Sequence, residues 1–272
     1  MTAADVGATT PGPTHRVTTS LVLWSAAAVA WIATIVWAAS RDMGAMPGTM
    51  ELGFATFVGM WAVMMAAMML PSVSPFVGTY ARTVRTRRVP RLFALAVGYL
   101  GAWAATGVGA YLLARAFGSV ASERAWAARV IAPAAFAAAG LYQLTPLKRR
   151  CLSHCRSPIA HLFHYLSFRG VTRDLRAGFR HGLFCLGCCW ALMVLLVAFG
   201  VMNLLAMVGV ALVIAVEKLW RHGEQFARAV GAAALIYAVV VAFAPRLAPG
   251  LDPDRTMPDG RVPMEMQMEM EG

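Results

Sequence analysis

All five cysteines of this chain lie in two short clusters, and a histidine stands close to the cysteines in both. The first cluster reads Cys151-Leu-Ser-His-Cys155, and the second reads His181-Gly-Leu-Phe-Cys-Leu-Gly-Cys-Cys189. Thiolate and imidazole groups are the soft and borderline ligands that hold copper, zinc and iron in proteins. The two clusters therefore predict a metal site with the candidate ligands Cys151, His154, Cys155, His181, Cys185, Cys188 and Cys189.

The cysteines of the second cluster fall on one face of a predicted helix. At 100° per residue, His181, Cys185 and Cys188 lie within about 60° of one another, with Cys189 next to them. One cysteine on such a face is typical of apolar packing, but three aligned with a histidine favour a metal site. The Cys185-Leu-Gly-Cys188 spacing is also that of a dithiol redox motif, so it leaves both chemistries open. We place this cluster near the cytoplasmic end of an apolar span.

The first cluster lies in a basic segment between two prolines. Cys151 and Cys155 are four residues apart, so both thiols can reach one ion if the segment forms a helical turn. Lys and Arg on both sides favour the thiolate form. Because both clusters are predicted on the cytoplasmic side, they can form a single site. His161 and His164 follow, and we expect them at the surface or the membrane interface rather than on the metal.

Methionine supplies a third group of soft side chains, with 17 among 272 residues. Met60, Met64 and Met68 repeat every fourth residue in an apolar segment, a pattern typical both of core packing and of a Cu(I) path. Other methionines lie outside the apolar segments, where packing does not explain them, and they favour copper capture. They are Met43, Met46, Met50, Met264, Met266, Met268 and Met270.

The composition indicates an integral membrane protein, because 59% of the residues are hydrophobic, only 14% are charged and the mean hydropathy is +0.63. Soluble domains carry about 25% charged residues. We expect an all-α, polytopic transmembrane helix bundle of about seven spans, within a range of six to eight, each needing roughly 20 apolar residues. The expected spans are Leu21–Ala39, Leu52–Leu70, Leu92–Phe117, Trp126–Leu144, Gly182–Val201, Leu204–Val216 and Phe226–Ala244.

The chain has a net charge of +11, and most of its basic residues lie in every second loop between the expected spans. This alternation predicts a cytoplasmic N-terminus in the inner membrane, with basic cytoplasmic loops at 72–91 and 145–180. Nucleic acid is therefore not an expected partner. Prolines at the ends of spans two and four should stop those helices, and Glu217 and Lys218 should form an interfacial pair at the cytoplasmic surface.

The same reasoning divides the chain into three parts. Residues 20–245 form the transmembrane helical domain, whereas residues 1–19 and 246–272 are small or polar and are expected to be disordered tails. The second tail is rich in methionine.

Several sequence elements together resemble a bacterial family of predicted metal-binding integral membrane proteins of uncharacterised activity. The resemblance covers Leu52 to Lys218 and implies a polytopic inner-membrane protein with a metal site on the cysteines. The elements are Met64-Met-Ala-Ala-Met-Met-Leu-Pro-Ser72, Tyr142-Gln-Leu-Thr-Pro-Leu-Lys148, Cys151-Leu-Ser-His-Cys-Arg-Ser-Pro158, Gly187-Cys-Cys-Trp-Ala-Leu-Met193, Gly200-Val-Met202 and Glu217-Lys218.

The leading hypothesis is a copper-handling membrane protein rather than an enzyme. It would transport or deliver Cu(I) from outer methionines to inner Cys and His ligands, although the ligand types also leave zinc and iron open. Expected partners are the metal ion, the lipid bilayer and a metallochaperone or client metalloenzyme. The competing hypothesis is a membrane thiol-disulfide oxidoreductase that uses Cys185 and Cys188, with Cys151 and Cys155 as a second pair. A third is a structural membrane subunit.

Overall fold

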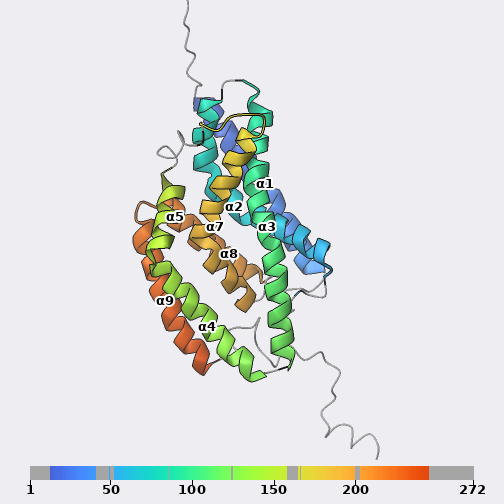
Figure 1. Cartoon of the computed structure of the whole chain (residues 1–272), viewed down its shortest axis with the longest axis vertical. Coiled ribbons are helices and arrows are strands. Elements are labelled where there is room, and N and C mark those ends of the chain that lie inside the picture. Colours follow the sequence, from blue (N-terminus) through green and yellow to red (C-terminus); the bar gives the residue numbers. More distant parts are fainter. Residues whose placement is uncertain are drawn as a thin grey trace, which may run out of the picture.

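Helices make up the ordered framework of the chain, and no strand occurs among the residues that the structure describes (Figure 1). The structure is a computed structural model, and it describes residues 13–40, 49, 52–84, 86–123, 125–157, 165, 167–199 and 203–244. The helices are α1 (Pro13–Ser40), α2 (Phe54–Thr83), α3 (Arg88–Glu123), α4 (Ala125–Leu144), α5 (Pro146–Arg156), α7 (Arg173–Phe199), α8 (Leu204–Leu219) and α9 (Gly223–Phe243). The all-α prediction is confirmed for this part of the chain.

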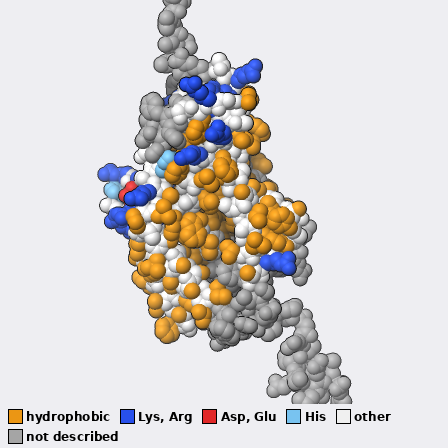
Figure 2. All heavy atoms as spheres, in the orientation of Figure 1, with side chains coloured by type: hydrophobic (Ala, Val, Ile, Leu, Met, Phe, Trp, Pro, Cys, Tyr) orange, Lys and Arg blue, Asp and Glu red, His pale blue; other side chains and the backbone are white. Residues whose placement is uncertain are grey.

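Five of these helices are long and apolar enough to cross a membrane, or six if the bent pair α4 and α5 counts as one span. The five are α1, α2, α3, α7 and α9, whereas α8 has only 16 residues. Hydrophobic side chains cover much of the face shown in Figure 2, as expected for helices that contact lipid. The bundle therefore has the character of a membrane protein. The span count of seven and the cytoplasmic N-terminus stay predictions.

The expected end of the second span is wrong, because α2 continues through Pro71 and Pro75 to Thr83. A proline lacks the N–H that would bond the carbonyl four residues earlier. Pro75 thus leaves the Pro71 carbonyl without its helical partner, and the Ser74 hydroxyl donates to that carbonyl at 2.8 Å. A side-chain donor of this kind lets a proline stand inside a membrane helix.

We expected the ranges 72–91 and 145–180 to be loops. Both contain helical residues, and these belong to other helices as well as to α2. Helix α5 occupies 146–156, and α7 begins at Arg173, nine residues before the expected start of the fifth span. The fourth span does end before Pro146, as predicted. Because α7 starts earlier, its cysteines lie near the middle of the helix and not at its end.

Glycines bring α7 against α3 at backbone distance. A Cβ atom at Gly178 would lie 1.9 Å from the Leu95 carbonyl oxygen, and one at Gly98 would lie 2.0 Å from the Leu175 carbonyl oxygen. Small residues allow this close approach between membrane helices. The pair Gly140 and Gly231 joins α4 to α9 in the same way.

The bend between α4 and α5 directs the first cysteine cluster towards α7. The Thr145 side chain accepts a hydrogen bond from the Lys148 amide, and Pro146 follows at the first helical position. Both features start a helix, and the new axis turns by 63° from α4. At the other end of α5, Arg156 donates to the carbonyls of Glu217 at 2.9 Å and Arg221 at 2.8 Å. Helix α5 is thus attached at both ends.

One end of the bundle is rich in basic residues, and a buried carboxylate joins three helices there. Asp174 at the start of α7 accepts from the Tyr80 hydroxyl at 2.5 Å and from Arg91 of α3 at 3.0 Å. Figure 2 shows most Lys and Arg side chains at the upper end of the molecule and at its left edge, with a further one at the lower right. The gathering of most basic side chains away from the apolar surface agrees with the charge pattern of the sequence.

Candidate metal centre

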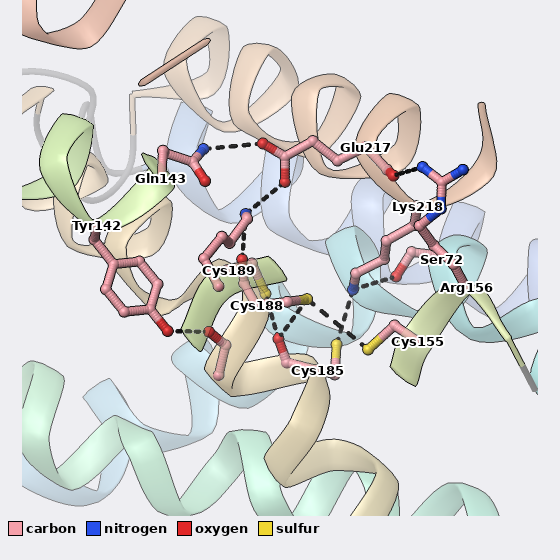
Figure 3. A network of polar contacts seen from close by, with 12 residues as sticks. Ser72, Tyr142, Gln143, Cys155, Arg156, Cys185, Cys188, Cys189, Glu217 and Lys218 are labelled. Carbon is pink, nitrogen blue, oxygen red and sulfur yellow. Dashed lines mark hydrogen bonds and ion pairs between the residues drawn. The ribbon is translucent and has the colours of Figure 1, made fainter. Parts of the chain in front are cut away.

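Thiols from α5 and α7 meet in the interior of the bundle (Figure 3). The Cys155 Sγ atom lies 3.9 Å from the Cys188 Sγ atom, although the residues are 33 positions apart in the chain. Cys185, Cys188 and Cys189 are all buried. Cys185 lies in the same turn of α7 as Cys188 and Cys189, whose thiols both contact its carbonyl. The structure therefore brings together four of the five cysteines, and none of the five forms a disulfide.

Two of the thiols on α7 are oriented by hydrogen bonds to the backbone of their own helical turn. The Cys188 thiol donates to the Cys185 carbonyl at 3.1 Å, and the Cys189 thiol donates to the same carbonyl at 2.8 Å. The Cys185 sulfur faces other groups, namely the Tyr99 hydroxyl at 3.0 Å and the Lys218 ammonium at 2.9 Å. The three thiols of this turn are thus oriented before any ligand arrives.

Cys151 packs one turn away from the thiol pair. Its Sγ atom would lie 2.7 Å from a Cβ atom at Gly187, so it fits only because that residue has no side chain. The Tyr142 hydroxyl donates to the carbonyl of the same glycine. Cys151 thus helps to pack α5 on α7, and no contact between its sulfur and another thiol is found among the described residues.

The two imidazoles lie in an aromatic layer near the thiols. His154 stacks on Phe184 with ring centres 3.6 Å apart, and His181 stacks on Phe76 at 3.8 Å. Their ring centres are 6.2 Å apart. The Tyr165 hydroxyl lies 2.6 Å from His154 Nε2, and burial raises the pKa of this tyrosine, so the hydroxyl stays protonated. Packing therefore fixes both rings close to each other.

The predicted methionine stripe is buried inside α2. Met60, Met64 and Met68 are each at most 3% exposed. The next position of the four-residue series is Ser72, whose hydroxyl lies 3.3 Å from the Lys218 ammonium. Because this ammonium also contacts Cys185, the stripe points along α2 towards the thiols.

The other methionines proposed for copper capture lie outside the described residues, and so do the two histidines expected at the surface or the membrane interface. The methionines are Met43, Met46, Met50, Met264, Met266, Met268 and Met270, and the histidines are His161 and His164.

The expected surface position of Glu217 and Lys218 is wrong, because both side chains are buried, at 1% and 8% exposure. Glu217 forms an ion pair with Lys148 at 2.6 Å and accepts from the Gln143 amide at 2.9 Å. Lys148 also donates to the Cys188 carbonyl. Figure 3 shows Lys218 directed instead towards Ser72 and Cys185.

Sequence reasoning missed the role of these ionisable residues, although a signal was present. A charged residue next to an apolar segment can be buried inside a bundle, and such residues are functional candidates by default. Two buried lysines thus contact the thiol cluster, Lys148 at the Cys188 carbonyl and Lys218 at the Cys185 sulfur.

Among the described residues, no group of three or more His, Cys, Asp or Glu side chains is arranged to hold a metal ion. Within the group of four cysteines, the sulfurs of Cys155 and Cys188 are in contact. A thiolate–metal bond is about 2.3 Å long, so two such bonds laid end to end exceed the 3.9 Å between Cys155 and Cys188. Two sulfurs at this separation are close enough to bind one soft ion with a bent geometry.

Comparison with known proteins supports the same chemistry. No curated protein and no solved structure matches the chain. A protein-family model described as "PpoB2: Copper chaperone" matches residues 58–241, which cover most of the chain and extend from α2 into α9. The matched range includes both cysteine clusters and the buried residues Lys148, Glu217 and Lys218. The chain belongs to the PpoB2 family of copper chaperones.

Proposed function

We propose that the protein holds Cu(I) between thiols of α5 and α7 within the membrane bundle and passes it to a client. The observation that carries this proposal is the buried pair Cys155 and Cys188, with 3.9 Å between the sulfurs. Membership of a copper chaperone family favours copper over zinc and iron as the ion. Two thiolates satisfy a soft monovalent ion, which needs fewer ligands than a structural zinc site with its four.

The neighbouring groups suit a transient site. Cys185 and Cys189 are further sulfurs within the same cluster, so an ion can change partners one bond at a time. His154, His181 and Cys151 stand around this cluster, and we propose them as secondary ligands. Each transfer step then forms one metal–ligand bond as another breaks, and the ion never becomes fully hydrated in an apolar interior.

The methionine stripe gives the proposed direction of movement. Thioethers at Met60, Met64 and Met68 are uncharged and bind Cu(I) more weakly than thiolates do. An ion that enters at the beginning of α2 therefore moves towards stronger ligands as it approaches Ser72 and Cys185. A metallochaperone or a metalloenzyme at the far side is the proposed recipient.

Copper binding by the purified full-length protein tests this proposal. The protein is loaded anaerobically with Cu(I) in detergent, and the bound copper is measured by elemental analysis and by competition with a chromophoric Cu(I) chelator. Cys155→Ser and Cys188→Ser should each lose the tightly bound copper. Cys151→Ser is the comparison variant and should keep the tightly bound copper, because this cysteine lies on the same helix as Cys155 but packs on Gly187 and serves only as a secondary ligand in this proposal.

The thermal unfolding of each variant is measured in parallel, so that a loss of copper is interpreted only for folded protein. Full copper content in both Cys155→Ser and Cys188→Ser would contradict the proposal.

A further inference from the structure

Arginines surround the contact between α5 and the turn that links α8 to α9. Arg156 at the end of α5 donates to the carbonyls of Glu217 at 2.9 Å and Arg221 at 2.8 Å (Figure 3). Gly223 allows this contact, because a Cβ atom at that position would clash with the Arg156 guanidinium. Figure 2 shows basic side chains at the left edge of the molecule, where α5 and this turn lie in Figure 1. The Arg156 guanidinium is therefore held at a basic surface.

The positive charge at this surface is not neutralised by ion pairs. Arg149 precedes Arg156 by seven residues, so the two share one face of α5. Arg149 and Arg221 are exposed. In the described part of the chain, none of these three arginines forms an ion pair with a carboxylate, and the Glu217 carboxylate pairs with Lys148 instead. Because arginine stays charged in proteins, this arginine cluster of Arg149, Arg156 and Arg221 attracts anions.

An apolar surface adjoins the arginine cluster. Leu219 and Trp220 at the end of α8 are 50% and 49% exposed. The Trp220 ring packs edge-on against Phe226, with ring centres 6.1 Å apart. An exposed tryptophan beside charged residues is typical of the level of the lipid headgroups. Glu224 of the following turn is also exposed, and the three arginines outweigh its single negative charge.

We infer that the arginine cluster binds an anionic phospholipid, whose headgroup phosphate contacts the guanidinium groups and whose acyl chain lies along Leu219 and Trp220. Arginine suits a phosphate, because its planar N–H groups donate two parallel hydrogen bonds. Basic pockets beside membrane helices bind such headgroups. An acidic protein would match the charge alone, whereas a phospholipid matches both the charge and the apolar surface next to it. This inference goes beyond the proposed function and does not depend on copper binding.

Lipid binding is measured by native mass spectrometry of the purified full-length protein in detergent. The probes are phosphatidylglycerol and phosphatidylcholine with the same acyl chains, so that only the headgroup and its net charge differ. The wild type should retain phosphatidylglycerol in preference. Arg149→Gln/Arg221→Gln should lower this retention by about tenfold or more. Arg82→Gln is the matched control and should retain the lipid as the wild type does, because Arg82 is an exposed arginine of α2 outside the cluster.

Thermal unfolding without added lipid shows whether each variant folds, and Arg221→Gln alone replaces the double variant if the latter does not. Equal retention of the two lipids by the wild type would overturn the lipid site and leave an acidic protein as the better match for its charge. Unchanged retention in the double variant would also overturn it, and so would an equal loss in Arg82→Gln. Displacement of phosphatidylglycerol by the same concentration of glycerol 3-phosphate would assign the cluster to a soluble phosphate and not to a lipid.

Discussion

The Lys148 ammonium and the Glu217 carboxylate lie 2.6 Å apart, and each side chain is only 1% exposed. The pair joins α5 to α8, and Lys148 also holds the Cys188 carbonyl of α7. Three helices thus meet at one buried ion pair beside the proposed copper ligands. The pair contacts the backbone of Cys188, whereas Lys218 contacts the sulfur of Cys185.

Removing one member of this pair should destabilise the protein strongly. Lys148→Met leaves the Glu217 carboxylate buried without its cation, and we expect a loss of about 3–5 kcal/mol. The double variant Lys148→Met/Glu217→Gln should recover part of this loss, because it removes the unpaired charge. Thermal unfolding of the two variants in detergent measures the difference. Equal midpoints for the single variant and the wild type would show that the pair contributes little.

The glycine contact between α3 and α7 should tolerate no side chain. Gly178→Ala would place a methyl group 1.9 Å from the Leu95 carbonyl oxygen, so the two helices must separate. We expect a destabilisation of about 1–3 kcal/mol or more, as for other overpacked cores. Gly101→Ala is the control, because a Cβ atom at that position of α3 meets nothing within 4 Å. The control should be neutral or slightly stabilising, and a matching loss there would remove the packing explanation.

Mild oxidation should join Cys155 to Cys188 in the copper-free protein. Their sulfurs are 3.9 Å apart, so a shift of about 2 Å brings them to the length of a disulfide. Bound Cu(I) should prevent this reaction, because both sulfurs are then occupied. Peptide mapping after treatment with diamide measures the cross-link with and without copper. Rapid cross-linking of the copper-loaded protein would place the ion elsewhere.

The C-terminal methionines should assist copper capture without being needed for folding. Deletion of Thr256–Gly272 should leave the thermal midpoint unchanged and should weaken copper uptake only when copper is scarce. Several weak ligands on one tether raise the local ion concentration, and thioethers bind independently of pH. Uptake by full-length and truncated protein is compared at limiting copper, at neutral and at acidic pH. Equal uptake under all conditions would assign the tail no part in copper capture.

The helices were predictable from the sequence where long apolar runs define them. The segments expected between Leu21 and Ala244 each correspond to a helix, and Pro146 separates α4 from α5 as its position suggests. Helix α5 itself was not assigned, because 11 mostly basic and polar residues show no long apolar run. The continuation of α2 past Pro75 was also hidden, since the carbonyl that Pro75 leaves without a helical partner accepts from the Ser74 hydroxyl.

The residue types of the candidate site can be read from the sequence, but the neighbours of those residues cannot. Three aligned cysteines on one helix face indicated a soft-metal site from local periodicity alone. The contact between Cys155 and Cys188 requires α5 to pack on α7, and periodicity carries no information about that packing. The burial of Lys148 and Lys218 was not predictable for the same reason. A basic residue at the end of an apolar segment usually extends to the membrane surface, and periodicity does not show that these two side chains turn into the bundle.

Because glycine contacts hold α7 against α3, the helix that carries Cys188 should open locally less often than the helix that carries Cys155. Helix α7 makes backbone contact with α3 at Gly178 and Gly182, whereas α5 has only 11 residues and depends on its attachments to neighbours. Amide hydrogens near Cys155 should therefore exchange with deuterium faster than those near Cys188. Copper bound to both sulfurs would link α5 to α7. Loading the site should therefore slow amide hydrogen exchange in α5 and leave exchange in α7 unchanged.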